Sequence, residues 1–167
     1  MTATLHSADS SPGHDDFSRA GADLVGLTKS ALNLAQIVDH VHAPEAGAID
    51  VFMGITRAQH DAALGALLRL EYAAYEEMAL AKTRQLLVLA RERWPICRIG
   101  LAHRLGPVCV GGASVIIAVS TGHREAAFRS CQFLIDSVKT TLPIWKNDIF
   151  ERGTRWQTGQ MIQAQGQ

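Results

Sequence analysis

One stretch limits the possible folds of this sequence more than any other: the apolar run from Ala113 to Ser120, ASVIIAVS. It contains no charged residue, and polar side chains do not alternate with apolar ones along it. A strand that is apolar on both faces is typical of the interior of a layered fold. We therefore expect a β-strand here that is covered on both of its faces.

An amphipathic helix is predicted soon after this strand, from Arg124 to Thr140. At about 100° per residue, its apolar side chains fall on one stripe. The stripe consists of Ala127, Phe128, Cys131, Leu134, Ile135 and Val138. Lys139 lies at the border of the stripe, where its ammonium group can reach water. Pro143 ends the helix.

The other segments with a clear pattern are shorter. Helices are predicted for residues 33–41 and 76–94, and strands for 23–28, 48–56, 67–75, 96–102 and 144–150. We expect 57–66 to be a loop and 103–107 to be a turn. Strands and helices do not alternate strictly, so the sequence predicts an α+β fold. In it, three main helices pack on a mixed or antiparallel sheet.

A chain of 167 residues is expected to form one domain. Residues 1–22 are rich in small and polar side chains, so we predict a disordered tail there. This tail lacks the apolar segment of a secretory signal, and its three Asp against one Arg argue against a mitochondrial transit peptide. The domain is expected at 23–157 and a flexible C-terminal tail at 158–167.

Composition excludes several classes of function. The formal net charge is zero, which argues against bulk electrostatic binding to nucleic acid. No apolar run approaches the roughly 18 residues that a membrane span needs. Cys97, Cys109 and Cys131 lack the spacing of a zinc site or a disulfide framework. We expect them to be buried thiols, as in a reducing compartment.

Positive charges stand at the two ends of the helix predicted after the apolar strand. His123 and Arg124 open it, where free backbone N–H groups favour anions. Lys139 and Lys146 lie on either side of its end and would meet if the chain reverses there. Arg57 follows another predicted strand. Each is also compatible with an ordinary solvated side chain, but together they would bind a dianion and lower the pKa of a lysine.

Several stretches together resemble one family, the large (catalytic) subunit of molybdopterin synthase. They are AGAIDVFMGITR (46–57), LEYAAYEEMA (70–79), RWPICRIGLAHRLGPV (93–108), ASVIIAVSTGHREAAF (113–128) and VKTTLPIWKND (138–148). HRLG, then GHR, then the two lysines, in this order and spacing, make the resemblance specific. It implies an α/β hammerhead-type fold and a sulfurtransferase of molybdenum cofactor biosynthesis.

The resemblance also implies the reaction and the partners. Sulfur would pass to cyclic pyranopterin monophosphate, called precursor Z, and form the dithiolene of molybdopterin. The donor would be a thiocarboxylate on the C-terminal Gly-Gly of a small ubiquitin-like subunit. Two large subunits would form a homodimer with one small subunit at each end, a heterotetramer in the cytoplasm. No metal or other cofactor would be required, because the partner brings the sulfur.

Individual residues match positions of known importance in the family. Lys139 and Lys146 match the two essential lysines beside the thiocarboxylate tail, so we expect them to be catalytic and to contact substrate. Arg57 matches an arginine that helps to bind substrate. His123 and Arg124 match a pair that binds the phosphate region of the substrate from across the dimer.

Three further residues are expected to bind substrate. Asn147 and Asp148 follow the second lysine, where a basic residue and Glu are common in the family. Arg155 matches a pocket arginine. The sequence departs from the family at Ala73, where Glu is frequent, and at Gly122, where Ala is usual. The loop after the first motif also differs from that of many relatives.

The sequence is also compatible with two other functions. The chain could be a non-catalytic module that binds a ubiquitin-like tail or a phosphorylated ligand, with the lysines as docking charges. It could also be an acyltransferase that uses Lys139 as a nucleophile on a different substrate.

Overall fold

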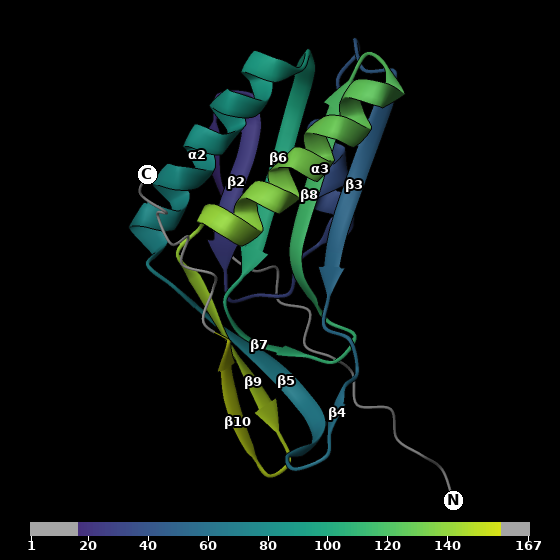
Figure 1. Cartoon of the computed structure of the whole chain (residues 1–167). Helices are drawn as coiled ribbons and strands as arrows, with labels where there is room; N and C mark the ends of the chain where they lie inside the picture. The colour runs from purple at the N-terminus through teal and green to yellow at the C-terminus, as the bar shows by residue number, and fades with distance from the viewer. Residues whose placement is uncertain (1–16, 158–167) are drawn as a thin grey trace, which may run out of the picture.

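Two β-sheets and three helices make up residues 17–157, the part of the chain that the computed structural model describes (Figure 1). The first sheet has the strand order β1-β2-β6-β8-β3. Its strands are β1 (Phe17–Ala20), β2 (Asp23–Thr28), β6 (Ile96–Arg104), β8 (Ala113–Thr121) and β3 (Ala48–Ile55). β2 and β6 run parallel and the other neighbours antiparallel, so the predicted mixed sheet is confirmed.

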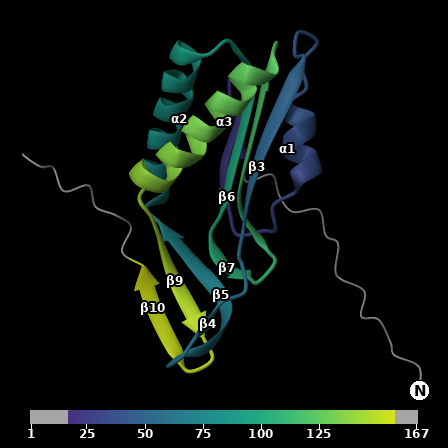
Figure 2. The same ribbon diagram turned by 45° about the vertical axis from the view of Figure 1, so that its right-hand side comes forward.

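The helices cover both faces of the first sheet. They are α1 (Leu34–Val41), α2 (Glu76–Arg93) and α3 (Arg124–Thr141). α2 and α3 lie side by side on one face, and α1 lies on the opposite face (Figures 1 and 2). The prediction of three main helices is confirmed. Within residues 17–157, no helix combines the length and the apolar character that crossing a membrane requires.

β8 lies between two hydrophobic cores and is buried along nearly its whole length. On one face, Ile117 belongs to the main core together with Leu134 of α3. On the other face, Ile116 belongs to a second core together with Ile37 and Val41 of α1. The predicted strand with two covered faces is therefore confirmed, and it holds α3 firmly against the sheet.

A partly buried ion pair ties α2 to this sheet. Arg91, near the end of α2, donates hydrogen bonds from Nη2 and Nε to the carboxylate of Asp23, at 2.6 and 3.2 Å. The same carboxylate accepts the backbone N–H of Ile99 on β6 at 2.9 Å. Since Asp23 is buried, these bonds offset the cost of removing its charge from water.

The second sheet lies below the first in Figure 1. Its strand order is β10-β9-β5-β4, and β7 also pairs with β5. Its strands are β4 (His60–Asp61), β5 (Gly65–Ala74), β7 (Gly106–Cys109), β9 (Ile144–Phe150) and β10 (Gly153–Gln157). A small core of Leu67, Leu70 and Phe150 stabilises it.

Three strands of the second sheet differ from our expectations. β4 and the start of β5 lie in the expected loop 57–66, β7 extends the expected turn, and β10 follows the strand expected to be the last. These strands are short, and β4 and β7 lack a readable alternation of apolar residues. They form because β5 and β9, which are distant in sequence, offer hydrogen-bonding partners.

The prediction of a disordered tail at 1–22 was wrong for residues 17–20. β1 forms there and pairs with β2 from Phe17↔Gly26 to Ala20↔Asp23. Gly26 makes this possible, because any side chain at that position would collide with the ring of Phe17. Residues 1–16 and the C-terminal tail at 158–167 lie outside the described residues.

The predicted apolar stripe of α3 is correct except at Phe128. Its side chain is 58% exposed, whereas Ala127, Cys131 and Leu134 are buried. Ser130 is buried instead, because its hydroxyl donates to a backbone carbonyl of its own helix. The buried face of α3 is therefore rotated away from Phe128, which leaves a large aromatic ring at the surface.

Candidate active site

A cavity of about 710 Å³ opens where the C-terminal half of α3, the end of β3 and the second sheet meet. It brings together three of the cations that the sequence singled out: Arg57, Lys139 and Lys146. Other polar side chains line it as well, namely Thr56, Gln59, Tyr72, His103, Ser114, Thr140 and Gln157. No carboxylate is among its described lining residues. The cavity is therefore suited to an anionic ligand.

The two lysines meet because the chain reverses after α3. The helix ends at Thr141, and β9 begins three residues later. Lys146 on β9 then lies opposite Tyr72 of β5 and beside β10. Lys139, in the last turn of α3, holds its Nζ 5.5 Å from the ring centroid of Phe52, a cation–π contact. The reversal at Pro143 brings both lysines to one cavity.

Arg57 reaches the cavity from the end of β3. The residue before it, Thr56, is fixed by two backbone hydrogen bonds, from its N–H to Gly112 O at 2.9 Å and from Gly111 N–H to its own carbonyl at 2.8 Å. The turn at Gly111 requires a φ of 84°, which glycine adopts without strain. The Arg57 side chain itself is exposed. Arg57 is thus an exposed cation that follows a backbone segment fixed by hydrogen bonds.

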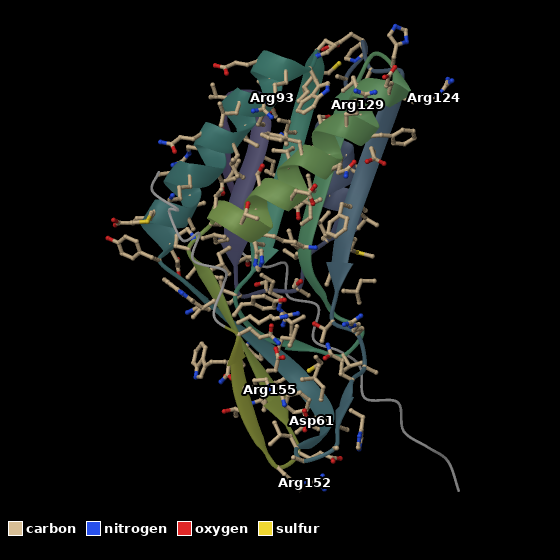
Figure 3. The ribbon with its side chains drawn as sticks, viewed as in Figure 1. Asp61, Arg93, Arg124, Arg129, Arg152 and Arg155 are labelled. Carbon is tan, nitrogen blue, oxygen red and sulfur yellow. The ribbon has the colours of Figure 1, made fainter. Side chains whose placement is uncertain are left out.

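His123 and Arg124 lie at the opposite end of α3 from the cavity. From Arg124 to Lys139 the helix rises by about 22 Å, at ~1.5 Å per residue. Both residues are exposed, and Figure 3 shows Arg124 at the other end of the molecule from Arg155. Within one chain, the structure does not bring this pair to the cavity.

Asn147 and Asp148 are buried, with exposures of 8% and 1%, and neither lines the cavity. Asp148 Oδ2 accepts a hydrogen bond from Gln157 at 2.9 Å. Asp148 Oδ1 and Asn147 Oδ1 have no partner among the described residues. Side chains alternate along β9, so Asp148 shares the face of Lys146, whereas Asn147 lies on the opposite face.

Arg155 does not line the cavity either. It pairs with Asp61 of β4, and the two residues lie together at the lower end of the molecule in Figure 3. The hydrogen bond from Arg155, together with the backbone N–H groups of Leu64 and Ala63, lowers the pKa of Asp61 to about 2. Arg155 therefore holds the segment after Arg57 against β10.

Further bonds hold the same segment. Arg152 Nε donates to Ala63 O at 3.0 Å, and Ala66 N–H donates to the Glu151 carboxylate at 3.1 Å. The sequence predicts a loop at 57–66. The structure instead shows a short hairpin, formed by β4 and β5, that is fastened to the β9–β10 turn.

The sequence reasoning assigned none of the other polar lining residues to the site, and among them Tyr72, His103 and Ser114 contact one another. His103 was expected in a turn, but it lies on β6 and is only 6% exposed. Burial lowers the pKa of its imidazole to about 4. A signal was present, because Ile99, Leu101 and His103 continue one alternation along β6.

No three side chains of the kinds that ligate metals come together within residues 17–157. The cavity instead offers ammonium and guanidinium groups at its exposed side and hydroxyl and imidazole groups at its buried side. Such a site can bind an anion and polarise a carbonyl group.

Known proteins resemble this chain in sequence and in fold. A family model described as MoaE protein matches residues 27–141. The molybdopterin synthase catalytic subunit of Arabidopsis thaliana is 42% identical over 125 residues, covering 75% of this chain and 62% of that protein. The human protein of the same name is 36% identical over 142 residues, covering 85% and 74%.

Among solved structures, a molybdopterin synthase from Staphylococcus aureus is similar, with a TM-score of 0.75 and 32% identity. The match covers 79% of this chain and 95% of that one. The fold of residues 17–157 is thus one that a solved structure also adopts.

Proposed function

The chain belongs to the MoaE protein family, and from this membership we propose that it is the catalytic subunit of a molybdopterin synthase. It transfers sulfur from the C-terminal thiocarboxylate of a small ubiquitin-like subunit to precursor Z. The observation that carries the proposal is the meeting of Lys139, Lys146 and Arg57 in one cavity. A cavity whose described lining carries cations and no carboxylate suits a tail and a substrate that are both anionic.

The two lysines have different surroundings, which supports different roles. Lys139 is exposed on the last turn of α3, where an incoming tail can reach it. It polarises the carbonyl of the thiocarboxylate or forms a transient covalent bond with it. Lys146 is half-buried between β5 and β10, and it stabilises the phosphate or the developing oxyanion.

Precursor Z needs further cations for its cyclic phosphate. Arg57 supplies one, and His123 and Arg124 of a second copy of the chain supply the others. This arrangement rests on a homodimer, which two surface features support. Phe128 lies one turn after Arg124 and is exposed, and the edge strand β3 also exposes apolar side chains.

The remaining predicted site residues do not contact the ligand and act through neighbouring residues. Asp148 lies on the face of β9 that carries Lys146 and accepts a hydrogen bond from Gln157 of β10, so it supports the strand that positions the lysine. Asn147 lies on the other face. Arg155 acts through Asp61 and the segment behind Arg57.

A cytoplasmic location is part of the proposal. Cys97, Cys109 and Cys131 are all free thiols, as is usual for proteins of a reducing compartment.

The test is reconstitution. The protein is mixed with a thiocarboxylated small subunit and precursor Z, and molybdopterin is measured. We expect product with the wild type and at least about a 100-fold lower rate with Lys139→Ala. Lys82→Ala on α2, which removes a lysine outside the cavity, is the matched control and should be unchanged.

The alternatives give other results. A non-catalytic module would bind the tail without forming product. An acyltransferase would transfer the tail's acyl group and leave precursor Z unchanged. Absence of molybdopterin with the wild-type chain would reject the synthase proposal.

A further inference from the structure

His103 is held in one orientation at the buried side of the cavity. Its Nδ1 lies 2.9 Å from the carbonyl oxygen of Arg104. A carbonyl can only accept, so Nδ1 carries the proton and donates it. In the neutral imidazole, Nε2 then has a lone pair and no proton. The backbone of β6 itself thus selects the tautomer.

Tyr72 fixes the ring from a second side. The two rings meet edge to face, with centroids 5.0 Å apart and an interplanar angle of 73°. The Tyr72 hydroxyl is hydrogen-bonded to Ser114, whose own hydroxyl donates to Gly54 O at 3.2 Å. Three strands therefore hold the imidazole in place before any ligand binds.

Nε2 is the ring nitrogen that remains available to a ligand. Among the described residues, nothing hydrogen-bonds to it, and it is not one of the fully buried polar atoms that lack a partner. His103 also lines the cavity. Nε2 is therefore open to a small molecule inside it.

His103 is also the natural proton acceptor of this cavity. The titratable lining residues that the structure describes are Arg57, Tyr72, His103, Lys139 and Lys146. Burial raises the pKa of Tyr72, so its hydroxyl keeps its proton. Burial lowers the pKa of His103 to about 4, so its imidazole is unprotonated at neutral pH. Among residues 17–157, no carboxylate lines the cavity to compete for this role.

We propose that His103 is the general base that activates water to release the sulfur from the small subunit's tail. This step rests on the proposed function. Once the thiocarboxylate sulfur has bonded to a substrate carbon, it is still joined to the tail's carbonyl carbon. That carbon–sulfur bond must break, and the carbonyl carbon needs a new partner. Water is the simplest one.

The atoms balance as follows. Nε2 takes a proton from water while the water oxygen bonds to the carbonyl carbon. The carbon–sulfur bond then breaks, and its electron pair stays on sulfur. The proton on the imidazolium passes to sulfur or to solvent. One water is consumed, the tail becomes a carboxylate, the substrate keeps a thiol, and nothing is oxidised or reduced.

The test uses His103→Asn in the reconstituted complex with the small subunit and precursor Z. The Asn amide can still donate to the Arg104 carbonyl in the place of Nδ1–H, but it has no group in the place of Nε2. We expect molybdopterin formation to fall about 100-fold or more. We also expect an adduct of the small subunit and the substrate to accumulate, measured as intact mass after acid quench.

Two additions separate this role from a structural one. Hydroxylamine cleaves thioesters without a base, so adding it should release the adduct from His103→Asn. His40→Asn, on α1 and outside the cavity, is the matched control and should behave like the wild type. If His103→Asn fails to fold, His103→Gln takes its place, with the same expected adduct.

The outcomes are distinct. Wild-type turnover in His103→Asn would overturn the proposal. So would lost turnover without an adduct, since the block would then precede cleavage of the carbon–sulfur bond. If the wild type forms neither product nor adduct, the synthase function itself fails.

Discussion

Mixing two inactive variants should restore activity if the site is shared between two copies of the chain. Arg124 and Lys139 stand about 22 Å apart on one rigid helix, at ~1.5 Å per residue, which is too far for both to hold one small substrate. In a homodimer, Arg124→Ala and Lys139→Ala would damage the same site from different chains. A mixed dimer then has one doubly damaged site and one intact site.

The expected recovery follows from counting. With equal amounts and free exchange, about half of the dimers are mixed, and each has one intact site of two, so about a quarter of the wild-type rate returns. The assay is molybdopterin formation with excess thiocarboxylated small subunit after subunit exchange in mild denaturant. Lys139→Ala mixed with Lys146→Ala is the control. Both lysines belong to one chain's cavity, so no site is intact and no activity should return. If the mixture of Arg124→Ala and Lys139→Ala forms molybdopterin no faster than the two variants measured separately, the shared site is refuted.

Three other expectations concern stability and thiol chemistry. Asp23→Ala removes the carboxylate that accepts hydrogen bonds from Arg91. Because the ion pair is partly buried, the free energy of unfolding, measured in urea, should fall by about 2–4 kcal/mol. A loss below about 0.5 kcal/mol would contradict this. At pH 8, iodoacetamide should label the exposed Cys109 but not Cys131, since burial raises the pKa of Cys131 to about 12, and mass spectrometry reads the difference. Because its pKa falls from 3.8 to about 2 in the folded chain, Asp61 should add stability that is fully present above pH 4 and lost as the pH falls toward 2. Its carboxyl carbon should titrate accordingly by NMR, and a midpoint near 4 in the folded protein would argue against the arginine contact.

Local patterns predicted the first sheet and its helices well. The run at Ala113–Ser120 predicted a strand with two covered faces, and α1 and α3 cover those of β8. The periodicity of α3 gave its bounds to within one residue, but it placed Phe128 in the core. A helix projection cannot say which of two neighbouring positions faces the sheet when a serine can satisfy its hydroxyl within the helix.

The second sheet was harder to predict because β5, its central strand, depends on distant partners. β7 and β9 both pair with β5, while β10 is a short hairpin strand added to β9. Pairing between distant segments leaves little trace in a short run of residues.

The candidate site was predicted in part. Charge spacing singled out Lys139, Lys146 and Arg57, and the fold gathers them in one cavity. The same reasoning grouped His123 and Arg124 with them on the sequence. In one chain the length of α3 separates the two groups. Charge spacing did not single out His103, because one histidine after a predicted strand forms no cluster of charges.

The length of α3 also limits how this sequence can evolve. One inserted residue would lengthen the helix by ~1.5 Å and turn everything beyond it by ~100°, which would move Lys139 off the cavity or the buried stripe off β8. Substitutions on the exposed side of α3 away from Arg124, Phe128 and Lys139 are tolerable, but insertions and deletions are not. The hairpin after Arg57, which is fastened at its outer end, is where changes of length can accumulate at little cost to the cavity.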